Sequence, residues 1–439
     1  MGLILAGERS GVGKTTVALA ILAALTAWGE PVQSFKVGPD YLDPLWHRWL
    51  TRRPCPNLDT VLTSPDYLQR CYAYYTADVA YALVEGVMGL FDGPSSTAEI
   101  AKLLDLPVVL VVDCQRLAGS VAALVQGYAT WDPKLPIAGV VLNRVASDRH
   151  SELLRQALAP VGIPVVGECR RTDALHRPER HLGLVTPLEI ADFATWRDAL
   201  AHVGQHCFDW QVLRPLLRVS GESPALPPWP TLHCAKSVTL AVAYDEAFCF
   251  YYDDLFALLE VAGVALHFWS PLRDGPLPHT IHGLLLGGGY PELHAEPLSQ
   301  RSDLWRDLRQ RIAHGLPVYA ECGGLMVLGE ALIDQAGQAW PMARVLPLTT
   351  AMTGRLTLGY RCVQATQDTC FVRQGQTLTG HEFHYSQVVG GEPQPYYGHA
   401  TLHASYLHCH WGGCAQQVQQ FLDCVQQYTP QVVEGLTGA

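Results

Sequence analysis

Cys322 stands apart from the other cysteines of the chain because of the residues around it. The stretch "PVYAECGGLMVL" has an apolar run before the thiol, then two glycines and a second apolar run. This order predicts a strand, a sharp turn that carries the thiol, and a helix, as in the nucleophile elbow of hydrolases. A helix N-terminus favours the thiolate, and the N–H groups beside it, including that of Gly323, are available to an oxyanion. We therefore predict that Cys322 is a catalytic nucleophile.

A second glycine-rich turn could complete the site around this cysteine. The stretch "LLLGGGYPE" places Gly288 and Gly289 directly after a predicted strand. Backbone N–H groups in such a turn can face a developing negative charge, because glycine leaves them uncovered. We predict that this turn supplies the other half of an oxyanion hole.

A thiol nucleophile also needs a base, and the segment "HASYLHCHW" offers three histidines. These are His403, His408 and His410. If the segment is a strand, His408 and His410 share one face, since side chains alternate along a strand. Periodicity therefore does not choose between them, and any one of the three could instead be a structural residue.

The N-terminal stretch "GERSGVGKTT" follows a predicted strand and opens a predicted helix, as a phosphate-binding loop does. In such a loop, backbone N–H groups surround the phosphates, Lys14 reaches the terminal phosphates, and Thr15 can hold Mg²⁺. The strict motif has glycine where this chain has Glu8, so a chance "GKT" at a helix start is the alternative. The residues predicted to bind ATP are Gly11, Gly13, Lys14, Thr15, Thr16 and Asn143, although Asn143 could equally cap a turn.

Carboxylates gather in two loops that follow predicted strands of the same half. Asp40 and Asp43 lie in "FKVGPDYLDPLWH", and Glu85 and Asp92 lie in "VEGVMGLFDG". Ligands of open α/β sheets collect at the carboxyl ends of the strands, where both loops would lie. Hard oxygen ligands near a triphosphate suit Mg²⁺. Asp113, at the end of "LVVD", is a weaker candidate for the same neighbourhood.

The elements that position these residues read as two α/β domains. Short runs rich in Val, Ile and Leu, such as "LPVVLVVD" and "IAGVVLNRV", alternate with helical stretches, which predicts parallel sheets covered by helices on both faces. The proline-rich "SGESPALPPWPTLH" reads as a linker. We predict an ATP-binding domain over residues 1–190, a helical segment and linker over 191–235, and a second α/β domain over 236–439.

Composition restricts the function further. Of the 439 residues, 16% are charged and the formal net charge is −11, which argues against a nucleic-acid partner. No apolar run is long enough to span a membrane, and the N-terminus lacks the pattern of a signal peptide. We expect a cytoplasmic protein. Its thirteen cysteines, an odd number without a CxxC pair, then stay reduced.

Taken together, the motifs resemble one known family. The stretches "PVYAECGGLMVL", "GGGYPE" and "ASYLHCH" resemble the class I glutamine amidotransferase domain of the cobyrinic acid a,c-diamide synthase family. The stretches "AGERSGVGKTT", "FKVGPDYLDP", "NLDT", "VEGVMGLFDG", "VVLNRV" and "RHLGLV" resemble its ATP-dependent amide-forming domain, itself similar to dethiobiotin synthetase. The resemblance runs in order over nearly the whole chain.

The resemblance implies an activity and a role for each candidate residue. It implies amidation of the a- and c-carboxylates of cobyrinate with ATP and glutamine, and it allows a homodimer. Cys322 would be the nucleophile and His408 the base. Thr15 and Glu85 would hold Mg²⁺. The residues that would position the substrate are Asp40, Tyr41 and Asp43, although the two aspartates could also bind metal.

Several alternatives stay open at this point. Amidotransferases of other branches have Glu where this chain has His410, so the third member of the triad is not identified. The same reaction on hydrogenobyrinate or Ni-sirohydrochlorin fits the motifs equally, whereas "KVGPDYLDP" and "ASYLH" disfavour cobyric acid synthesis. A nucleotide-switched scaffold with an inactive amidotransferase domain is the non-enzymatic alternative.

Overall fold

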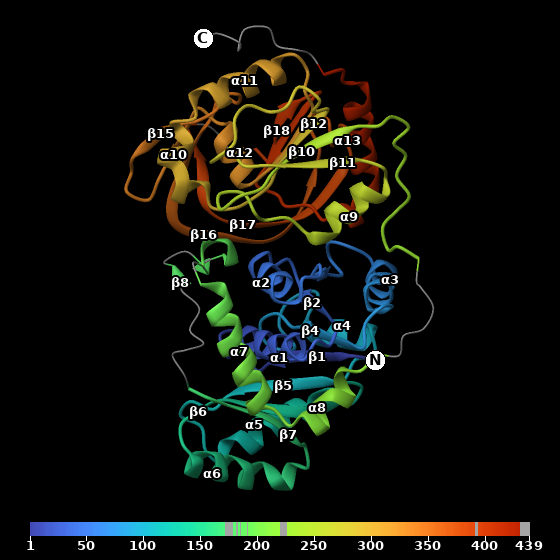
Figure 1. Ribbon diagram of the computed structural model, residues 1–439, viewed down its shortest axis with the longest axis vertical. Helices are drawn as coiled ribbons and strands as arrows, with labels where there is room; N and C mark the ends of the chain where they lie inside the picture. The colour runs from blue at the N-terminus through green and yellow to red at the C-terminus, as the bar shows by residue number, and fades with distance from the viewer. Residues whose placement is uncertain are drawn as a thin grey trace. The chain divides into compact units, whose positions relative to one another are not determined.

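The computed structural model describes residues 1–171, 179–180, 183–184, 186–190, 192–219, 226–390 and 394–430 (Figure 1). The chain divides into two compact units, Met1–Pro228 and Trp229–Ala439. Part of the "RHLGLV" motif and residues 220–225 of the predicted linker lie outside the described residues. The predicted architecture of two parallel-sheet α/β units is confirmed.

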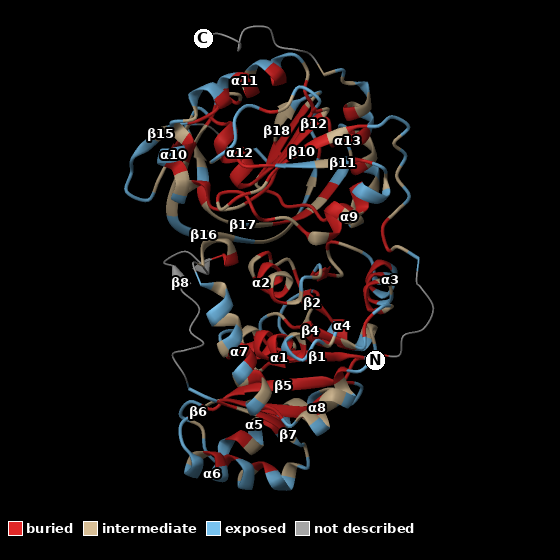
Figure 2. Ribbon diagram, in the orientation of Figure 1, coloured by how far each residue is buried: buried red, intermediate tan, exposed pale blue. Residues whose placement is uncertain are grey.

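The first unit is built on a seven-stranded parallel sheet in the order β3-β2-β4-β1-β5-β6-β7. Every residue of β1, β2 and β5 is buried, which explains their uninterrupted apolar sequences (Figure 2). The strands are β1 (Leu3–Gly7), β2 (Val32–Val37), β3 (Asn57–Leu58), β4 (Tyr81–Glu85), β5 (Val108–Asp113), β6 (Ile137–Val145) and β7 (Val165–Arg170).

Helices connect these strands and cover the sheet. The first helix is the most buried, with apolar residues on every side, because it lies between the sheet and α7. The two helices of the predicted 191–235 segment, α7 and α8, therefore pack within the first unit. The helices are α1 (Lys14–Ala27), α2 (Leu42–Thr51), α3 (Pro65–Thr76), α4 (Thr97–Leu103), α5 (Ser120–Trp131), α6 (Asp148–Leu158), α7 (Phe193–Cys207) and α8 (Trp210–Leu217). A short hairpin joins β8 (Glu179–Arg180) to β9 (Gly183–Leu184).

The second unit has a six-stranded sheet in the order β11-β10-β12-β13-β19-β18. All its neighbouring strands are parallel except β18, which runs antiparallel to β19 at one edge. The strands are β10 (Thr239–Ala243), β11 (Ala265–Trp269), β12 (Gly283–Leu286), β13 (Val318–Glu321), β18 (Tyr397–His399) and β19 (Leu402–Ser405). The helices are α9 (Asp253–Val261), α10 (Ala295–Ser299), α11 (Ser302–Ala313), α12 (Gly323–Leu328) and α13 (Ala415–Gln427).

A second sheet of this unit, β15-β14-β16-β17, was not predicted. It is dominated by the long antiparallel pair of β16 (Thr349–Gln364) and β17 (Thr377–Val389), with the short strands β14 (Ala331–Ile333) and β15 (Ala339–Pro341) beside it. Most residues of β16 are only partly buried, so the strand lacks the apolar run that identifies the central strands.

None of the helices in the described part of the chain has both the length and the apolar character needed to cross a membrane.

Candidate functional site

The predicted phosphate-binding loop connects the end of β1 to the start of α1. Gly11 and Gly13 have φ angles of 77° and 92°, which residues with side chains rarely adopt. A Cβ on Gly13 would also lie 2.3 Å from Nδ2 of Asn143. That amide donates a hydrogen bond of 2.7 Å to the carbonyl of Val12. The structure thus places Asn143 in support of the loop, and both glycines are required by the backbone.

The Lys14 ammonium lies over the loop and is held by carbonyl groups. Its Nζ donates to the carbonyls of Met88, at 2.5 Å, and Arg9, at 3.3 Å. Burial, with the positive charge of Lys36 nearby, lowers the pKa of Lys14 to about 8. No carboxylate is paired directly with Lys14 in the described part of the chain, and the more distant charges of Glu85 and Asp43 compensate its burial only in part. Thr16 lies in the same turn of α1 and is partly buried.

Glu8, which departs from the strict motif, has a structural role. Its carboxylate accepts a hydrogen bond from the N–H of Asp113 at 3.2 Å, and its carbonyl accepts one from the Tyr128 hydroxyl at 2.6 Å. These contacts attach the start of the loop to the end of β5 and to α5. The departure is therefore compatible with a well-formed loop.

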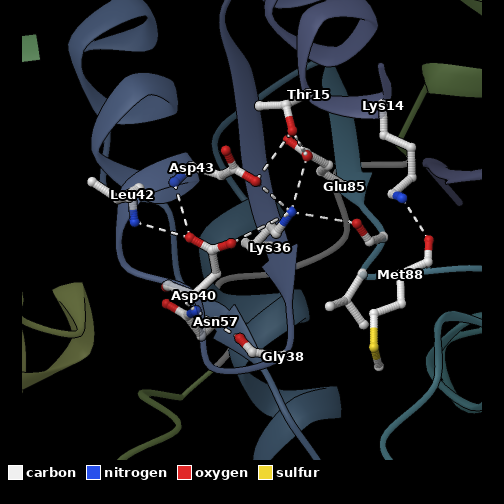
Figure 3. Close-up of polar contacts among 12 residues, drawn as sticks. Lys14, Thr15, Lys36, Gly38, Asp40, Leu42, Asp43, Asn57, Glu85 and Met88 are labelled. Atoms are coloured by element: carbon white, nitrogen blue, oxygen red, sulfur yellow. Dashed lines mark hydrogen bonds and ion pairs between the residues drawn. The ribbon is translucent and has the colours of Figure 1, made fainter. Parts of the chain in front are cut away.

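Beside the loop, the partly buried Thr15 and three buried charged side chains form a polar cluster (Figure 3). The Thr15 hydroxyl lies 2.6 Å from Oε1 of Glu85 and 3.2 Å from Oδ2 of Asp43. The Lys36 ammonium lies between the same two carboxylates, at 2.9 Å from Glu85 and 2.7 Å from Asp43. The predicted metal ligands are thus brought together with Asp43, and Lys36 joins them.

Opposing effects set the charges in this cluster. Burial and the negative charge of Asp43 disfavour ionised Glu85, but Lys36 and His47 outweigh them, so the pKa of Glu85 is lowered. His47 Nε2 lies 2.7 Å from the second oxygen of Glu85. Burial likewise opposes the Lys36 ammonium, but the surrounding carboxylates raise its pKa. The result is a buried ion cluster in which each charge depends on its neighbours.

The structure distinguishes Asp40 from Asp43. Oδ1 of Asp40 accepts the backbone N–H groups of Leu42 and Asp43, at 2.9 and 3.0 Å, at the start of α2. Its other oxygen lies 4.0 Å from Lys36, whereas Asp43 contacts Lys36 directly. Tyr41 is buried at the N-cap position of α2. Asp43 thus belongs to the ion cluster, and Asp40 mainly shapes the turn that leads to it.

The oxygen donors of this cluster fit a magnesium ion. Thr15, Asp43 and Glu85 present hard oxygens, and Mg²⁺ commonly binds one or two carboxylates together with phosphate oxygens and water. The cluster already stabilises a buried positive charge, that of Lys36. Among the described residues, no three His, Cys, Asp or Glu side chains are grouped as a metal site. An ion here would therefore depend on Thr15 and on the nucleotide for its remaining ligands.

Two other predicted carboxylates lie outside the cluster. Asp92 accepts the N–H of Gly89 at 2.9 Å and so stabilises the loop after β4. Asp113, at the end of β5, pairs with Arg144 at 2.7 Å and with Arg9 at 3.2 Å. Both have structural partners in the protein.

Cys322 occupies a sharp turn between β13 and α12. Its backbone angles, φ 48° and ψ −100°, are strained for a residue with a side chain. Its N–H donates to the carbonyl of Ser405 on the neighbouring strand β19 at 2.7 Å. Only 6% of the residue is exposed. The predicted strand, elbow and helix are thus present, although α12 is short.

The two glycine-rich turns meet beside this elbow. A Cβ on Gly323 would lie 3.2 Å from the backbone nitrogen of Gly289, so these two backbones approach closely. A Cβ on Gly288 would lie 2.6 Å from the ring of His408. The structure therefore brings together the residues predicted to form the oxyanion hole, and larger side chains would not fit between them.

His408 lies against both Cys322 and Glu321. Its Nδ1 is 3.3 Å from Oε2 of Glu321. Burial lowers the pKa of His408, but hydrogen bonds to Cys322 and Glu321 outweigh it and raise the pKa to about 10. The backbone of His408 exchanges two hydrogen bonds of 2.9 Å with His381 on β17. This arrangement favours an imidazolium beside the sulfur.

The histidine segment does not continue as a strand, so the condition under which His408 and His410 would share one face is not met. Strand β19 ends at Ser405, whose hydroxyl accepts the N–H of Leu407 at 2.9 Å. A side chain that takes up a backbone donor in this way competes with the strand ladder. His408 and His410 therefore do not share a strand face.

The other two candidate histidines have different surroundings. His410 Nε2 lies 3.6 Å from Asp254, and its ring packs against Tyr252. His403 lies on β19, where Nδ1 is 3.1 Å from the Thr369 hydroxyl. Burial lowers the pKa of His410 to about 4 and that of His403 to about 3. Both are therefore neutral near pH 7.

Sequence reasoning missed three residues that the structure places in these sites. Lys36 and His47 flank the predicted carboxylates, and Glu321 precedes the predicted nucleophile. All three lie inside or beside the motifs identified above. Their positions in strands and helices could have been predicted, but not which charged neighbours they meet.

Comparison with known proteins identifies both domains. Residues 3–185 match the CobQ/CobB/MinD/ParA nucleotide binding domain, and residues 239–417 match the CobB/CobQ-like glutamine amidotransferase domain. A cobyrinate a,c-diamide synthase of Synechococcus sp. is 47% identical over 98% of this chain and 99% of its own length. One from Synechocystis sp. is 47% identical over 96% of this chain and 92% of its own length. A hydrogenobyrinate a,c-diamide synthase of Streptomyces coelicolor is 38% identical, over 96% of both chains. The chain therefore belongs to the cobyrinate a,c-diamide synthase family.

Proposed function

We propose that this protein uses ATP and glutamine to convert the a- and c-carboxylates of cobyrinate into amides. The observation that carries the proposal is the match to cobyrinate a,c-diamide synthases over almost the whole chain. It is supported by two clusters of the right chemistry, one around Lys14 and Thr15 and one around Cys322. The proposed location is the cytoplasm.

The first cluster suits the activation of a carboxylate. A carboxylate does not react with ammonia, because hydroxide is a poor leaving group. Transfer of the terminal phosphoryl group of ATP to a carboxylate oxygen gives an acyl phosphate and ADP, and ammonia then displaces phosphate. Lys14, with its poorly compensated charge, would stabilise the phosphoryl oxygens during transfer, and the N–H groups of the Gly11–Gly13 loop would bind the phosphates.

Thr15, Asp43 and Glu85 would hold Mg²⁺ in this site. When bound, the ion neutralises phosphate charge. Lys36 supplies a positive charge to the same carboxylates and favours the ionised form of Glu85. Asp40 and Tyr41 would shape the substrate side through the turn at the start of α2.

The second cluster suits the release of ammonia from glutamine. Cys322 would attack the side-chain amide carbon, and the N–H groups near Gly289 and Gly323 would stabilise the oxyanion. His408 would then give its proton to the departing ammonia, leaving a thioester on Cys322. Hydrolysis of the thioester releases glutamate. The ammonia formed in this way is unprotonated and can attack the acyl phosphate.

A mass-spectrometric assay tests the proposal. The purified protein is incubated with ATP, Mg²⁺ and glutamine labelled with nitrogen-15 in its side-chain amide, and with cobyrinate. We expect two labelled amides per cobyrinate, with ATP and glutamine both required. The proposal would be contradicted if no amidated product formed, or if the product contained no nitrogen-15.

Hydrogenobyrinate is the second candidate substrate. The relative from Streptomyces coelicolor is a hydrogenobyrinate a,c-diamide synthase and matches this chain over 96% of its length. The assay therefore includes hydrogenobyrinate and Ni-sirohydrochlorin in parallel reactions. The substrate with the highest kcat/KM identifies the tetrapyrrole.

A further inference from the structure

Glu321 is a buried carboxylate at the end of β13, directly before the Cys322 elbow. Only 6% of the residue is exposed. Strand β13 pairs in parallel with β19, and Glu321 is the last paired residue, opposite Ser405. A carboxylate at this position needs partners, because burial of an unpaired charge is costly.

The partners of Glu321 fix both of its oxygens. Oε1 accepts the backbone N–H of Cys409 at 2.9 Å and the hydroxyl hydrogen of Tyr319. Oε2 lies 3.3 Å from Nδ1 of His408. One oxygen is thus bound by the protein, and the other faces the imidazole.

We propose that Glu321 is the positioning residue that orients His408 for its work on Cys322. With Nδ1 facing a carboxylate, the imidazole carries its proton on that nitrogen, which leaves Nε2 to exchange a proton with the sulfur. The carboxylate also stabilises the imidazolium that forms. The inference rests on the glutaminase function proposed for Cys322.

This role differs from the arrangement in amidotransferases whose acid follows the histidine. In this chain the corresponding position holds His410, which faces Asp254 and Tyr252. Burial lowers the pKa of His410 to about 4, so it is neutral near pH 7 and stabilises a positive charge on His408 poorly. The acid is instead supplied from the strand that carries the nucleophile.

The other titratable groups near the pair do not take over this role. His381 and His384, from β17, are near enough for their charges to affect His408, but burial lowers the pKa of each to about 4. Tyr406 is near Cys322, and burial raises its pKa far above neutral. All three are uncharged near pH 7, so Glu321 supplies the negative charge that faces His408.

Glu321→Gln tests the proposal with little change in shape. The amide oxygen can keep the bonds from Cys409 and Tyr319, while the NH₂ group turns toward Nδ1. An NH₂ donor there favours the tautomer with the proton on Nε2, which cannot accept a proton from the thiol. We expect glutaminase kcat to fall by about 10²-fold or more, since a misassigned tautomer removes the base. KM for glutamine should change little.

The pH dependence of Cys322 alkylation by iodoacetamide distinguishes the two roles, because it should not change if Glu321 is only structural. In the wild type, we expect Cys322 to react at pH 6–7, because the positively charged imidazole of His408 lies beside its sulfur. In Glu321→Gln the pH profile should shift toward that of an ordinary thiol, and Glu321→Asp should restore part of the low-pH reactivity. An unchanged pH profile in Glu321→Gln would overturn the proposal.

Asp254→Asn is the matched control, because it also converts a buried carboxylate that faces a histidine of the same segment. We expect it to keep the alkylation profile. If the two variants lose activity equally with wild-type alkylation profiles, the role of Glu321 is structural and the inference fails. If the wild type itself has no glutaminase activity, the proposed function fails instead.

If Glu321→Gln does not fold, the alkylation pH profile of Glu321→Asp is compared with that of the wild type. A shifted profile supports the inference, and an unchanged profile overturns it.

Discussion

At the scale of residues, two buried lysines of one site have pKa values shifted in opposite directions. Lys36 is surrounded by Asp43 and Glu85, and their charges raise its pKa despite burial. Among the described residues, no carboxylate forms an ion pair with Lys14, and burial together with Lys36 lowers its pKa to about 8. Carboxylates of the protein therefore neutralise the charge of Lys36, whereas the charge of Lys14 is available to interact with the phosphates of a nucleotide.

The lowered pKa of Lys14 predicts a pH dependence of ATP binding. Phosphate groups stabilise the ammonium, so the pKa of Lys14 should rise on binding. Below pH 8 the free protein already carries the charge, and affinity should be flat with respect to this group. Above pH 8 binding requires proton uptake, so affinity should fall by up to about tenfold per pH unit. Calorimetry in buffers of different ionisation enthalpy measures both effects.

Lys14→Arg is the control for this prediction. The arginine guanidinium stays protonated across this pH range. The ATP affinity of the variant should therefore not fall above pH 8, whatever its absolute value. An equal slope in the variant and the wild type would show that another group is responsible.

Glu85→Gln should weaken the metal site far more than Asp40→Asn. Glu85 contacts Thr15 and Lys36 directly, whereas Oδ1 of Asp40 binds backbone N–H groups that an asparagine oxygen could still accept. We expect the Mg²⁺ concentration for half-maximal ammonia-dependent amidation to rise at least about tenfold in Glu85→Gln, with partial recovery at high Mg²⁺. A larger effect in Asp40→Asn would move the metal to that carboxylate.

At the scale of elements, the sequence allowed the central strands to be predicted but not the surface hairpin. Buried parallel strands such as β5 require apolar side chains on both faces, and this shows as an uninterrupted run. The hairpin of β16 and β17 has partly exposed faces, and its polar residues gave no such signal. Its importance lies in long-range contacts, since β17 holds the backbone of His408 through His381.

The sites, like the strands, could be predicted from the sequence only where local residue patterns determine them. The glycine turns and the loop at Lys14 could be predicted, because their backbone geometry restricts the residue types locally. The placement of Lys36 among carboxylates and of Glu321 beside His408 depends on which strands are neighbours in the sheet. Strand order is a property of the whole fold, so no local pattern contains it.

Gly380→Ala should misplace His408. A Cβ on Gly380 would lie 2.5 Å from the carbonyl oxygen of His408, so the contact must open. Displacement by about 1 Å can cost on the order of 10²-fold in rate, and we expect glutaminase kcat to fall accordingly while ammonia-dependent amidation persists. Gly354→Ala, on β16, is the control, because nothing lies within 4 Å of its added Cβ. Equal glutaminase activity in both variants would show that β17 does not fix the base.

At the scale of the whole molecule, the two reactions belong to separate compact units. In the proposed mechanism, ammonia is produced at Cys322 in the second unit and consumed at the Lys14 site in the first. Each unit has its own sheet and its own buried core, so each site should survive the loss of the other's chemistry.

A crossed pair of variants tests this division. Cys322→Ala should abolish glutamine-dependent amidation but keep most of the activity with added ammonium salts. Lys14→Ala should abolish amidation from either nitrogen source, since phosphoryl transfer loses its main side-chain cation, while glutamine hydrolysis remains measurable. Product formation and glutamate release are followed in the same samples. Loss of the ammonium-dependent reaction in Cys322→Ala would contradict a two-site enzyme.

The strained backbone at Cys322 has a consequence for the evolution of this protein. A residue with a side chain held at φ 48° and ψ −100° costs about 1–3 kcal/mol of folding free energy. Glycine would remove this strain, although the greater conformational entropy of its unfolded chain lowers the free energy of unfolding by about 0.4–1 kcal/mol. Cys322→Gly should therefore be inactive as a glutaminase yet melt at a higher temperature than Cys322→Ala. Selection for stability alone would favour losing the thiol, so we expect a lineage to keep this elbow only while the ammonia that it is proposed to release is needed.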